Sequence, residues 1–256
     1  MTAPLRSPDA EQSHARRPTK PASVARNACN PRGLRDLPVK VQSADPATKR
    51  RAAALYKALE AEYPDAECEL TWSQPHELLV ATILSAQATD AGVNKATPGL
   101  FRAFPTPADY AASTPQAIER HVRTIGLFRQ KAKSIHAAMT TLVNEFDGEV
   151  PRTVPELLTL RGVARKTAGV VLGHCFGIND VFVVDTHVQR LAYRFGFVSE
   201  PKLDPLKVER VLMGAFPRPK WCRATDLFIF HGRRSSPARG WDPKAHPIDR
   251  RFAVNA

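Results

Sequence analysis

The sequence predicts an all-α protein with about nine or ten helices joined by short connections. Three observations support this fold class. Apolar residues recur at helical spacing over most of the chain after residue 46. Several of these segments begin with a capping residue and a proline, which is typical of helix starts. Strand-like segments are few and do not alternate with the helices, so a βαβ architecture is not expected.

The length and charge of the chain restrict its architecture and its partners. With 256 residues it can form one large domain or two small lobes, and no apolar run reaches the roughly 18–20 residues of a membrane span. The net charge is +12, from 37 Lys and Arg against 25 Asp and Glu, which favours a polyanionic partner, nucleic acid first. Half of this excess lies in residues 1–50, where ten Lys and Arg accompany four Asp and Glu. The other half of the excess charge is spread over the remaining residues and is weaker evidence for such a partner.

The cysteines and the N-terminus indicate a reducing compartment. The four cysteines lie far apart and form no CxxC pair; they are Cys29, Cys68, Cys175 and Cys222. This spacing favours free thiols over a disulfide framework or a compact metal knuckle. The N-terminal residues lack the continuous apolar core of a secretory signal. We therefore expect no membrane partner.

Residues 1–46 are predicted to form a disordered basic arm, because they contain seven prolines and almost no apolar periodicity. A first helix is expected from Pro46, where "ATKRRAAALYKALEAEY" combines helix formers with apolar residues at helical spacing. After Trp72, "SQPHELLVATILSAQAT" has Ser73 as the expected N-cap and Pro75 in the first turn. Apolar residues nearly encircle this second helix, which predicts that it is buried at the centre of the fold.

The helical pattern continues to residue 234. Capping boxes are expected where Ser113 precedes Gln116 and where Thr153 precedes Glu156, each with a proline in the first turn. The segment "ELLTLRGVARKTAGVVLGHCF" predicts two helices separated only by a short turn. The segment "VFVVDTHVQRLAYRFGF" predicts a short β-branched run, an N-cap at Asp185 and another helix. Two more helices are expected in "KVERVLMGAF" and "KWCRATDLFIFHGRR".

The turn at residues 160–164 is a candidate phosphate-binding site. Gly162 can adopt the positive φ that a sharp corner between two helices requires. The next helix then presents unpaired N–H groups and its positive dipole end, which bind phosphate whatever the base sequence. An ordinary helical hairpin has the same pattern, so this stretch alone leaves both interpretations open. A nucleotide-binding P-loop is excluded, because its second glycine and its preceding strand are missing.

Lys166 and Asp185 are the candidate catalytic residues. Lys166 lies at a helix start, and both the positive helix end and the small apolar next turn favour a neutral, nucleophilic amine. A solvated or phosphate-pairing lysine fits the same position. Asp185 ends an apolar run at another helix start, where an aspartate commonly serves as N-cap. It could instead be a carboxylate held beside Lys166 in a cleft, and spacing along the sequence does not decide between these roles.

Five motifs, taken in order, resemble those of the endonuclease III family of DNA glycosylases, within the helix-hairpin-helix superfamily. The motifs are "LLVATILSAQATDAGVNKAT", "VRTIGLFRQKAKSI", "LRGVARKTAGVVL", "VVDTHVQRLAYRFG" and "DLFIFHGRR". The resemblance extends from about residue 47 to residue 233, which is most of the chain after the predicted arm. Five motifs in the same order are far more specific than any one of them.

The resemblance implies a role for each matching residue. Lys166 matches the nucleophilic lysine of the family and Asp185 its catalytic aspartate. Gln87 and Leu127 match residues that enter the duplex where a damaged nucleotide has been flipped out. His187 matches a position on the wall of the lesion site. The hairpin contributes four DNA-binding positions, which are Leu160, Gly162, Ala164 and Arg165. The resemblance also implies that its carbonyls can bind a monovalent cation.

The resemblance also implies a two-lobed architecture with a DNA-binding cleft between the lobes. The first lobe is expected to be a six-helix unit over residues 69–178 that contains the helix-hairpin-helix. The second helical lobe is expected to combine residues 47–68 with residues 179–256. The implied partner is damaged double-stranded DNA, bound by a monomer. In a prokaryote such a protein is expected in the cytoplasm, associated with the nucleoid, while a nuclear or organellar location stays open.

A lysine at position 166 implies the bifunctional branch of the family, because relatives that act on adenine or thymine mismatches carry a non-amine residue there. We therefore expect a base-excision-repair glycosylase that also cleaves abasic sites by β-elimination and that acts on oxidised pyrimidines. The same fold could act on another lesion class, such as an oxidised purine. A DNA-damage-binding protein with little turnover is a second alternative, although a mere binder needs neither Lys166 nor Asp185.

Two parts of the sequence depart from the family pattern. In the hairpin, Arg161 replaces a proline and Ala164 replaces a second glycine, which can hinder close approach of the backbone to phosphate. At the C-terminus the family holds a [4Fe-4S] cluster with four cysteines, but the matching positions here are Ser236, Pro243, His246 and Phe252. We therefore predict no iron–sulfur cluster and no cofactor required for the chemistry. Packing of Trp241 against the preceding helix is one way to fold this segment without a metal.

Overall fold

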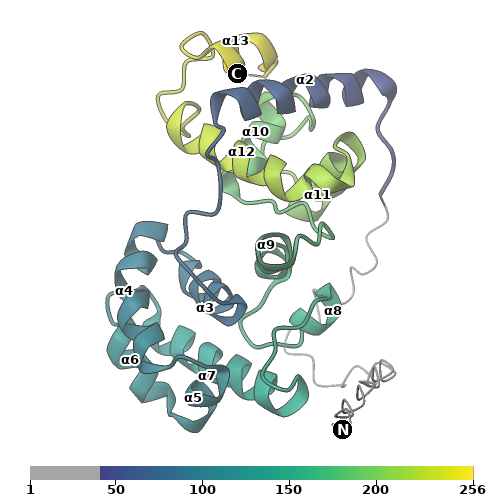
Figure 1. Cartoon of the computed structure of the whole chain (residues 1–256). Coiled ribbons are helices and arrows are strands. Elements are labelled where there is room, and N and C mark those ends of the chain that lie inside the picture. Colours follow the sequence, from purple (N-terminus) through teal and green to yellow (C-terminus); the bar gives the residue numbers. More distant parts are fainter. Residues whose placement is uncertain (1–40, 256) are drawn as a thin grey trace, which may run out of the picture.

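The computed structural model describes residues 41–255, and their regular structure is entirely helical, which confirms the all-α prediction (Figure 1). It contains twelve α-helices and one 3-10 helix, η1, where the sequence predicted about nine or ten. The excess includes α5 and α13, which have only six residues each, too few to show a helical period in the sequence. The elements are α2 (Pro46–Glu62), α3 (Pro75–Ser85), α4 (Asp90–Ala103), α5 (Pro107–Ala112), α6 (Pro115–Val122), α7 (Phe128–Glu145), α8 (Val154–Leu157), α9 (Arg165–Phe176), α10 (Thr186–Arg194), α11 (Pro205–Ala215), η1 (Arg218–Lys220), α12 (Trp221–Arg234) and α13 (Pro247–Phe252).

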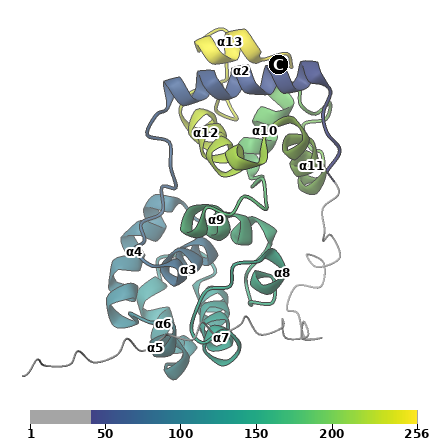
Figure 2. The ribbon, with the colours of Figure 1, turned by 45° about the vertical axis from the view of Figure 1, so that its right-hand side comes forward.

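The helices form two lobes, which lie one above the other in Figures 1 and 2. One lobe contains α3 to α9, and its hydrophobic core extends from Leu70 to Val183. This lobe has seven helices, where the family resemblance implied six. The other lobe contains α2 and α10 to α13 around a separate core, which combines residues 52–66 with residues 182–252. The first helix of the described chain therefore packs with the C-terminal part.

Helix α9 lies at the boundary between the lobes (Figure 2). It packs against α3 and α8 of its own lobe and against α12 of the other. Helix α3, which the sequence predicts at the centre of the fold, is buried along most of its length and packs against α4, α7 and α9. The helix that follows the predicted phosphate-binding turn thus lies where both lobes can contribute side chains.

The β-branched run before α10 connects the lobes as extended chain. Val181 and Val183 belong to the core of the first lobe, whereas Phe182 between them belongs to the core of the second. This alternation follows from extended backbone, in which successive side chains point to opposite sides. The run packs closely on α9, since a Cβ added at Gly169 would lie 2.7 Å from Val183 Cγ2. It therefore brings Asp185, two residues later, to the boundary that α9 occupies.

Two of the predicted helix starts are displaced by one residue. The N-cap of α3 is Gln74 and not Ser73, because the N–H and the hydroxyl of Ser73 both donate to a glutamate in the first turn. The N-cap of α6 is Thr114 and not Ser113, whose hydroxyl donates to the carbonyl of Tyr110 at the end of α5. The predicted caps that the structure confirms are Thr153 of α8 and Asp185 of α10.

Most of the predicted basic arm, residues 1–40, lies outside the described residues. The rest of that prediction is wrong in its boundary, because residues 41–45 already pack against the second lobe. The Ala44 N–H donates to the carbonyl of Gly214 on α11 (3.1 Å), and Asp45 caps α2 with its side chain. Between residues 41 and 255, no helix has the length and apolar character that crossing a lipid bilayer requires.

Candidate active site

The turn predicted to grip phosphate lies between α8 and α9. Gly162 has a positive φ of 84°, as the sequence predicts. A Cβ added there would also lie 2.9 Å from the Cβ of Ser134 on α7, so backbone conformation and lack of space both require glycine. Ala164 is the N-cap of α9, and its side chain gives the first turn no hydrogen bond. The N–H groups at the start of α9 are therefore available to an anion such as phosphate.

Two of the predicted DNA-gripping side chains point into the protein instead. Leu160 is fully buried in the core of the first lobe, and its carbonyl accepts the N–H of Val163 (3.1 Å). Arg165 forms a bidentate ion pair with Glu209 of α11, with Nη2···Oε1 at 2.7 Å and Nε···Oε2 at 2.9 Å. Both side chains of this pair are largely buried. The guanidinium of Arg165 therefore joins α9 to the second lobe, while the predicted role of Arg165 in DNA binding stays a prediction.

Lys166 and Asp185, which the sequence could not place relative to one another, line the same cavity of about 90 Å³ between the lobes. Lys166 lies in the first turn of α9 and is exposed, so its amine is accessible from the cavity. The burial that we expected to favour a neutral amine is absent, because the apolar residues that follow, such as Ala168 and Leu172, face the core. Accessibility, and not desolvation, distinguishes this lysine.

Asp185 combines both roles that the sequence left open. As the N-cap of α10, its Oδ1 accepts the N–H groups of His187 and Val188, each at 2.8 Å. The same residue lines the cavity with Lys166. Two backbone hydrogen bonds fix the orientation of the carboxylate. The geometry therefore provides an amine and an oriented carboxylate in one cavity, which is the requirement for attack on an electrophilic carbon beside a developing positive charge.

Several polar residues of the cavity were not predicted as site residues. They come from the connector before α3 and from α9 and α12, and they are Glu67, Cys68, Glu69, His174, Cys222, Asp226 and Arg233. Arg233 ties the two lobes together, because it pairs with Glu69 of the connector and with Asp90 Oδ2 of α4 (2.7 Å). His174 pairs with Asp226 (3.4 Å). Although burial disfavours the charged ring, hydrogen bonds to Asp226 and Cys222 raise the pKa of His174 to about 11.

Gln87 and Leu127, the residues predicted to enter the duplex, occupy two exposed turns that lie side by side. A Cβ added at Gly126 would lie 4.0 Å from the carbonyl oxygen of Gln87. Both residues have left-handed backbone, with φ of 56° at Gln87 and 59° at Leu127, a conformation that strains any residue with a side chain. Leu127 is 64% exposed, although it is a large apolar residue. Strained backbone at both residues and an exposed leucine are consistent with side chains that contact a binding partner.

His187 lies beside the cavity and does not line it. Its Nδ1 is hydrogen-bonded to Nη2 of Arg190 (3.1 Å), and its Cβ packs on Gly232 of α12. Burial lowers the pKa of His187, and the charges of Arg190 and Arg233 lower it further against the opposing effect of Asp185. His187 thus forms a contact between α10 and α12, and its predicted place on the lesion-site wall stays a prediction.

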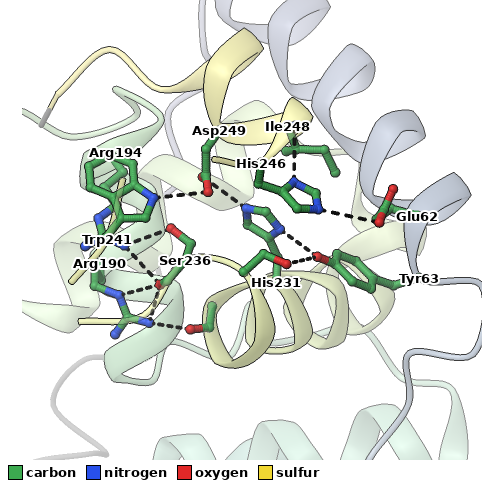
Figure 3. A network of polar contacts seen from close by, with 12 residues as sticks. Glu62, Tyr63, Arg190, Arg194, His231, Ser236, Trp241, His246, Ile248 and Asp249 are labelled. Atoms are coloured by element: carbon green, nitrogen blue, oxygen red, sulfur yellow. Dashed lines mark hydrogen bonds and ion pairs between the residues drawn. The ribbon is translucent and has the colours of Figure 1, made fainter. Parts of the chain in front are cut away.

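The C-terminal segment, residues 235–252, is closed by a network of polar side chains (Figure 3). At its centre His231 and Asp249 pair at 3.0 Å, and neither side chain is exposed to solvent. The hydroxyl of Tyr63 is hydrogen-bonded to the other ring nitrogen of His231 (2.9 Å). Trp241 donates to the second oxygen of Asp249 (3.1 Å) and lies under the guanidinium of Arg194. Trp241 thus joins α10 to α13.

The four positions that match the family's cluster cysteines do not fit an iron–sulfur cluster, because none offers a thiolate. Ser236 is buried and its hydroxyl accepts from Arg194 (2.8 Å). His246 caps α13 and faces Glu62 of α2 at 3.5 Å, while Phe252 is buried in the second core. Pro243 is partly buried in the turn before α13. The described cysteines lie in the first lobe or at the cavity end of α12, away from this segment; they are Cys68, Cys175 and Cys222.

Comparisons with known sequences agree with this arrangement. Residues 80–218 match the family model of the HhH-GPD superfamily base excision DNA repair protein. The endonuclease III of Synechocystis sp. is 49% identical over 191 residues, which are 75% of this chain and 86% of that protein. The endonuclease III of Bacillus subtilis is 43% identical over 171 residues, 67% of this chain and 77% of that protein.

Solved structures give the same result. A non-covalent endonuclease III–DNA complex superposes with a TM-score of 0.74 at 40% identity, covering 78% of this chain and 92% of that one. A trapped endonuclease III–DNA covalent intermediate superposes with a TM-score of 0.75 at 39% identity, covering 80% and 95%. A thermostable thymine-DNA glycosylase shares the fold at 20% identity with a TM-score of 0.70.

Proposed function

Because the chain belongs to the endonuclease III family within the HhH-GPD superfamily, we propose that it is a base-excision-repair DNA glycosylase with abasic-site lyase activity. One observation carries the proposal: Lys166 and Asp185, from two separate segments, line one cavity between the lobes. The similarity to an endonuclease III trapped as a covalent DNA intermediate supports an enzyme and not a binding protein. We propose oxidised pyrimidines as substrates, in line with the family of the relatives.

The DNA-binding part of the proposal uses three separate features. The N–H groups at the start of α9, behind Gly162, bind the phosphate backbone without regard to base sequence. Gln87 and Leu127 project from the two strained turns and fill the gap that an extruded nucleotide leaves. The extruded nucleotide then enters the cavity with Lys166. The partner is damaged double-stranded DNA and the working unit is a monomer.

The chemistry follows from the two residues in the cavity. The neutral amine of Lys166 forms a bond to the sugar C1′, and the bond between C1′ and the base breaks, so that the base leaves with the electron pair and takes up a proton. The carboxylate of Asp185 stabilises the positive charge that develops on the sugar. Loss of the amine proton and opening of the sugar ring give a Schiff base. Removal of a 2′ proton then breaks the 3′ C–O bond, which nicks the strand.

We further propose that the C-terminal segment folds without an iron–sulfur cluster. The His231–Asp249 pair and its partners Tyr63 and Trp241 support this, since they connect α13 to α12 and to the end of α2. No cofactor takes part in the proposed steps. A monovalent cation at the hairpin carbonyls remains an expectation from the family resemblance. The bacterial relatives support a cytoplasmic, nucleoid-associated location, which we also propose.

The test is cleavage of a panel of duplexes that carry a single lesion. The proposal predicts base release and a β-elimination nick at a ring-saturated thymine, with little cleavage at an 8-oxoguanine in the same sequence. Preferential cleavage at the oxidised purine would keep the enzyme class and overturn the substrate. Binding to lesion DNA with no cleavage anywhere in the panel would instead support the damage-binding alternative.

A further inference from the structure

Three metal-binding side chains converge in the wall of the cavity, at the end away from the catalytic pair. His174 comes from the last turns of α9, and Cys222 and Asp226 come from the first turns of α12. Their potential ligand atoms all lie within 4.8 Å of one another. The Cys222 Sγ to His174 Nε2 distance is 3.7 Å, and the His174 Nε2 to Asp226 Oδ1 distance is 3.4 Å.

These separations match those of a tetrahedral zinc site. Zinc binds thiolate sulfur at about 2.3 Å and imidazole nitrogen or carboxylate oxygen at about 2.0–2.2 Å. Tetrahedral angles then place sulfur and nitrogen about 3.6 Å apart and nitrogen and oxygen about 3.4 Å apart. Two of the three separations therefore have the values of a tetrahedral site, and all three ligand atoms lie within 4.8 Å of one another. One thiolate and one carboxylate also neutralise the charge of a divalent ion, which a partly buried site requires.

The backbone around Cys222 is built to hold the thiol in this position. A Cβ added at Gly173 would lie 2.6 Å from Cys222 Sγ, so the thiol reaches α9 only because residue 173 is glycine. The Cys222 N–H donates to Oδ1 of Asn179 (2.9 Å), which fixes the start of α12. Cys222 and Asp226 are four residues apart on one helix and therefore share a face. The close packing of α9 on α12 thus creates the cluster.

We propose that His174, Cys222 and Asp226 bind one Zn²⁺ ion. The site requires the neutral imidazole of His174 and the thiolate of Cys222, so binding releases the proton of each of these groups that is protonated in the free protein. The fourth position faces the cavity, where a water molecule can complete the site. If the proposed function holds, the ion occupies the cavity that receives the extruded base, so that Zn²⁺ inhibits base release. The binding itself does not depend on that function.

The direct test is titration of the full-length protein with Co²⁺, which replaces Zn²⁺ and absorbs light when bound to thiolate. The protein carries the Cys29→Ser substitution, to remove the thiol outside the described residues, and is kept reduced with a phosphine. We expect one equivalent of Co²⁺ to produce a thiolate charge-transfer band and tetrahedral d–d bands, both abolished by added Zn²⁺. The Cys222→Ser and Asp226→Asn variants should each bind at least about tenfold more weakly. The matched Cys175→Ser variant should bind as the parent does.

Circular dichroism of each variant shows whether it remains folded, and Asp226→Asn retains the shape of the cluster if Cys222→Ser does not fold. Absence of the charge-transfer band in the folded parent overturns the proposal. Retention of that band in folded Cys222→Ser overturns it as well, because another thiol would then be the ligand. Inhibition is measured separately, on single-turnover base release with and without Zn²⁺. Binding without inhibition retains the metal site and rejects its regulatory consequence, whereas lack of any base release in metal-free protein counts against the proposed function alone.

Discussion

The charged groups of the candidate catalytic pair are accessible in the cavity that lies between the two lobes, whereas the central pair of the C-terminal segment is buried. In the cavity, Lys166 is exposed and Asp185 is fixed by backbone N–H groups. In the C-terminal segment, His231 and Asp249 are fully buried and are fixed by side chains from distant parts of the chain. A substitution in the cavity should therefore change reactivity and leave stability almost unaltered. A substitution in the segment should change stability first.

The contrast reflects two different physical demands. A nucleophile has to reach a substrate, so its side chain must remain accessible and its position must come from the backbone that carries it. A segment such as residues 235–252 is held by packing and by paired polar groups, since any unpaired group buried there costs free energy. The predictions below test this division, from the largest expected effect to the smallest.

The strongest expected effect is at Asp185. The Asp185→Asn substitution retains an oxygen that can cap α10 and removes the charge that stabilises the sugar cation. We expect base release to slow by about 10²- to 10⁴-fold, with a melting temperature close to that of the wild type. Single-turnover kinetics and thermal unfolding measure the two quantities.

The matched control is Asp204→Asn, since Asp204 caps α11 through the same kind of hydrogen bonds, to Leu206 and Lys207, outside the cavity. It should alter neither rate nor melting temperature. An Asp185→Asn protein that is as active as Asp204→Asn would remove the proposed role of the carboxylate.

The second prediction concerns Asp249. The Asp249→Asn substitution leaves His231 and Trp241 without their charged partner in a fully buried site. Breaking such a pair costs about 3 kcal/mol of the free energy of unfolding, measured by urea denaturation. The exposed Asp65→Asn substitution on the same lobe is the control and should cost less than about 0.5 kcal/mol. Equal losses in the two variants would mean that the network does not hold the segment.

The same network gives the stability a defined pH dependence. Burial acts to raise the pKa of Asp249, but hydrogen bonds from His231, Trp241 and Ser236 outweigh it and lower that pKa below its ordinary value. A carboxyl whose folded pKa is depressed stabilises the protein above its unfolded pKa of about 3.9, and this contribution is lost as the pH falls through the folded pKa. Between about pH 5 and pH 3 the wild type should therefore lose more stability than Asp249→Asn. Parallel pH profiles for the two proteins would contradict this assignment.

The third prediction compares the effects of replacing Arg165 and Arg161, two arginines of the hairpin, on stability and on DNA binding. Burial raises the pKa of Glu209 even though the ion pair with Arg165 acts to lower it. The charged form of this buried carboxylate is therefore stabilised by Arg165. Arg165→Ala should cost about 3 kcal/mol of stability, because Glu209 is left buried and unpaired. Arg161 is exposed, and Arg161→Ala should leave stability unchanged and make DNA binding less dependent on salt, by about one unit of the logarithmic slope. An Arg165→Ala protein of normal stability that binds DNA poorly would instead support the role that the family resemblance implies.

The smallest expected effect on the folded protein is at Leu127. Its side chain is largely exposed, so Leu127→Ala should change stability by less than about 0.5 kcal/mol. Loss of the wedge should slow base release about tenfold while binding to undamaged DNA is retained. Val254→Ala, which shortens another exposed apolar residue (62%), is the control and should have no effect on either quantity. A Leu127→Ala protein with normal base release would exclude the wedge.

Much of the fold and part of the site could be predicted from local sequence. Helical periodicity identified the longer helices, and the alternation of Val181, Phe182 and Val183 between two cores is a simple consequence of extended chain. The positive φ of Gly162 and the cap at Asp185 follow from residue type at a helix start. Each of these features depends on neighbours within a few positions.

The features that were missed or misassigned depend on residues far apart in the chain. The ion pair of Arg165 could not be predicted, because its partner Glu209 lies 44 positions away on another lobe. The network around His231 joins residue 63 to residue 249, and no periodic pattern connects those positions. The connector before α3 lines the cavity although it contains no motif. Local rules describe one element at a time and do not specify which elements meet.

The most direct measurement is borohydride trapping on duplex DNA that contains an abasic site. Borohydride reduces a Schiff base to a stable amine and so links the protein covalently to the DNA. We expect trapping by the wild type and by Lys57→Ala, an exposed lysine of α2 outside the cavity, and none by Lys166→Ala. Undiminished trapping by Lys166→Ala would show that the nucleophile lies elsewhere.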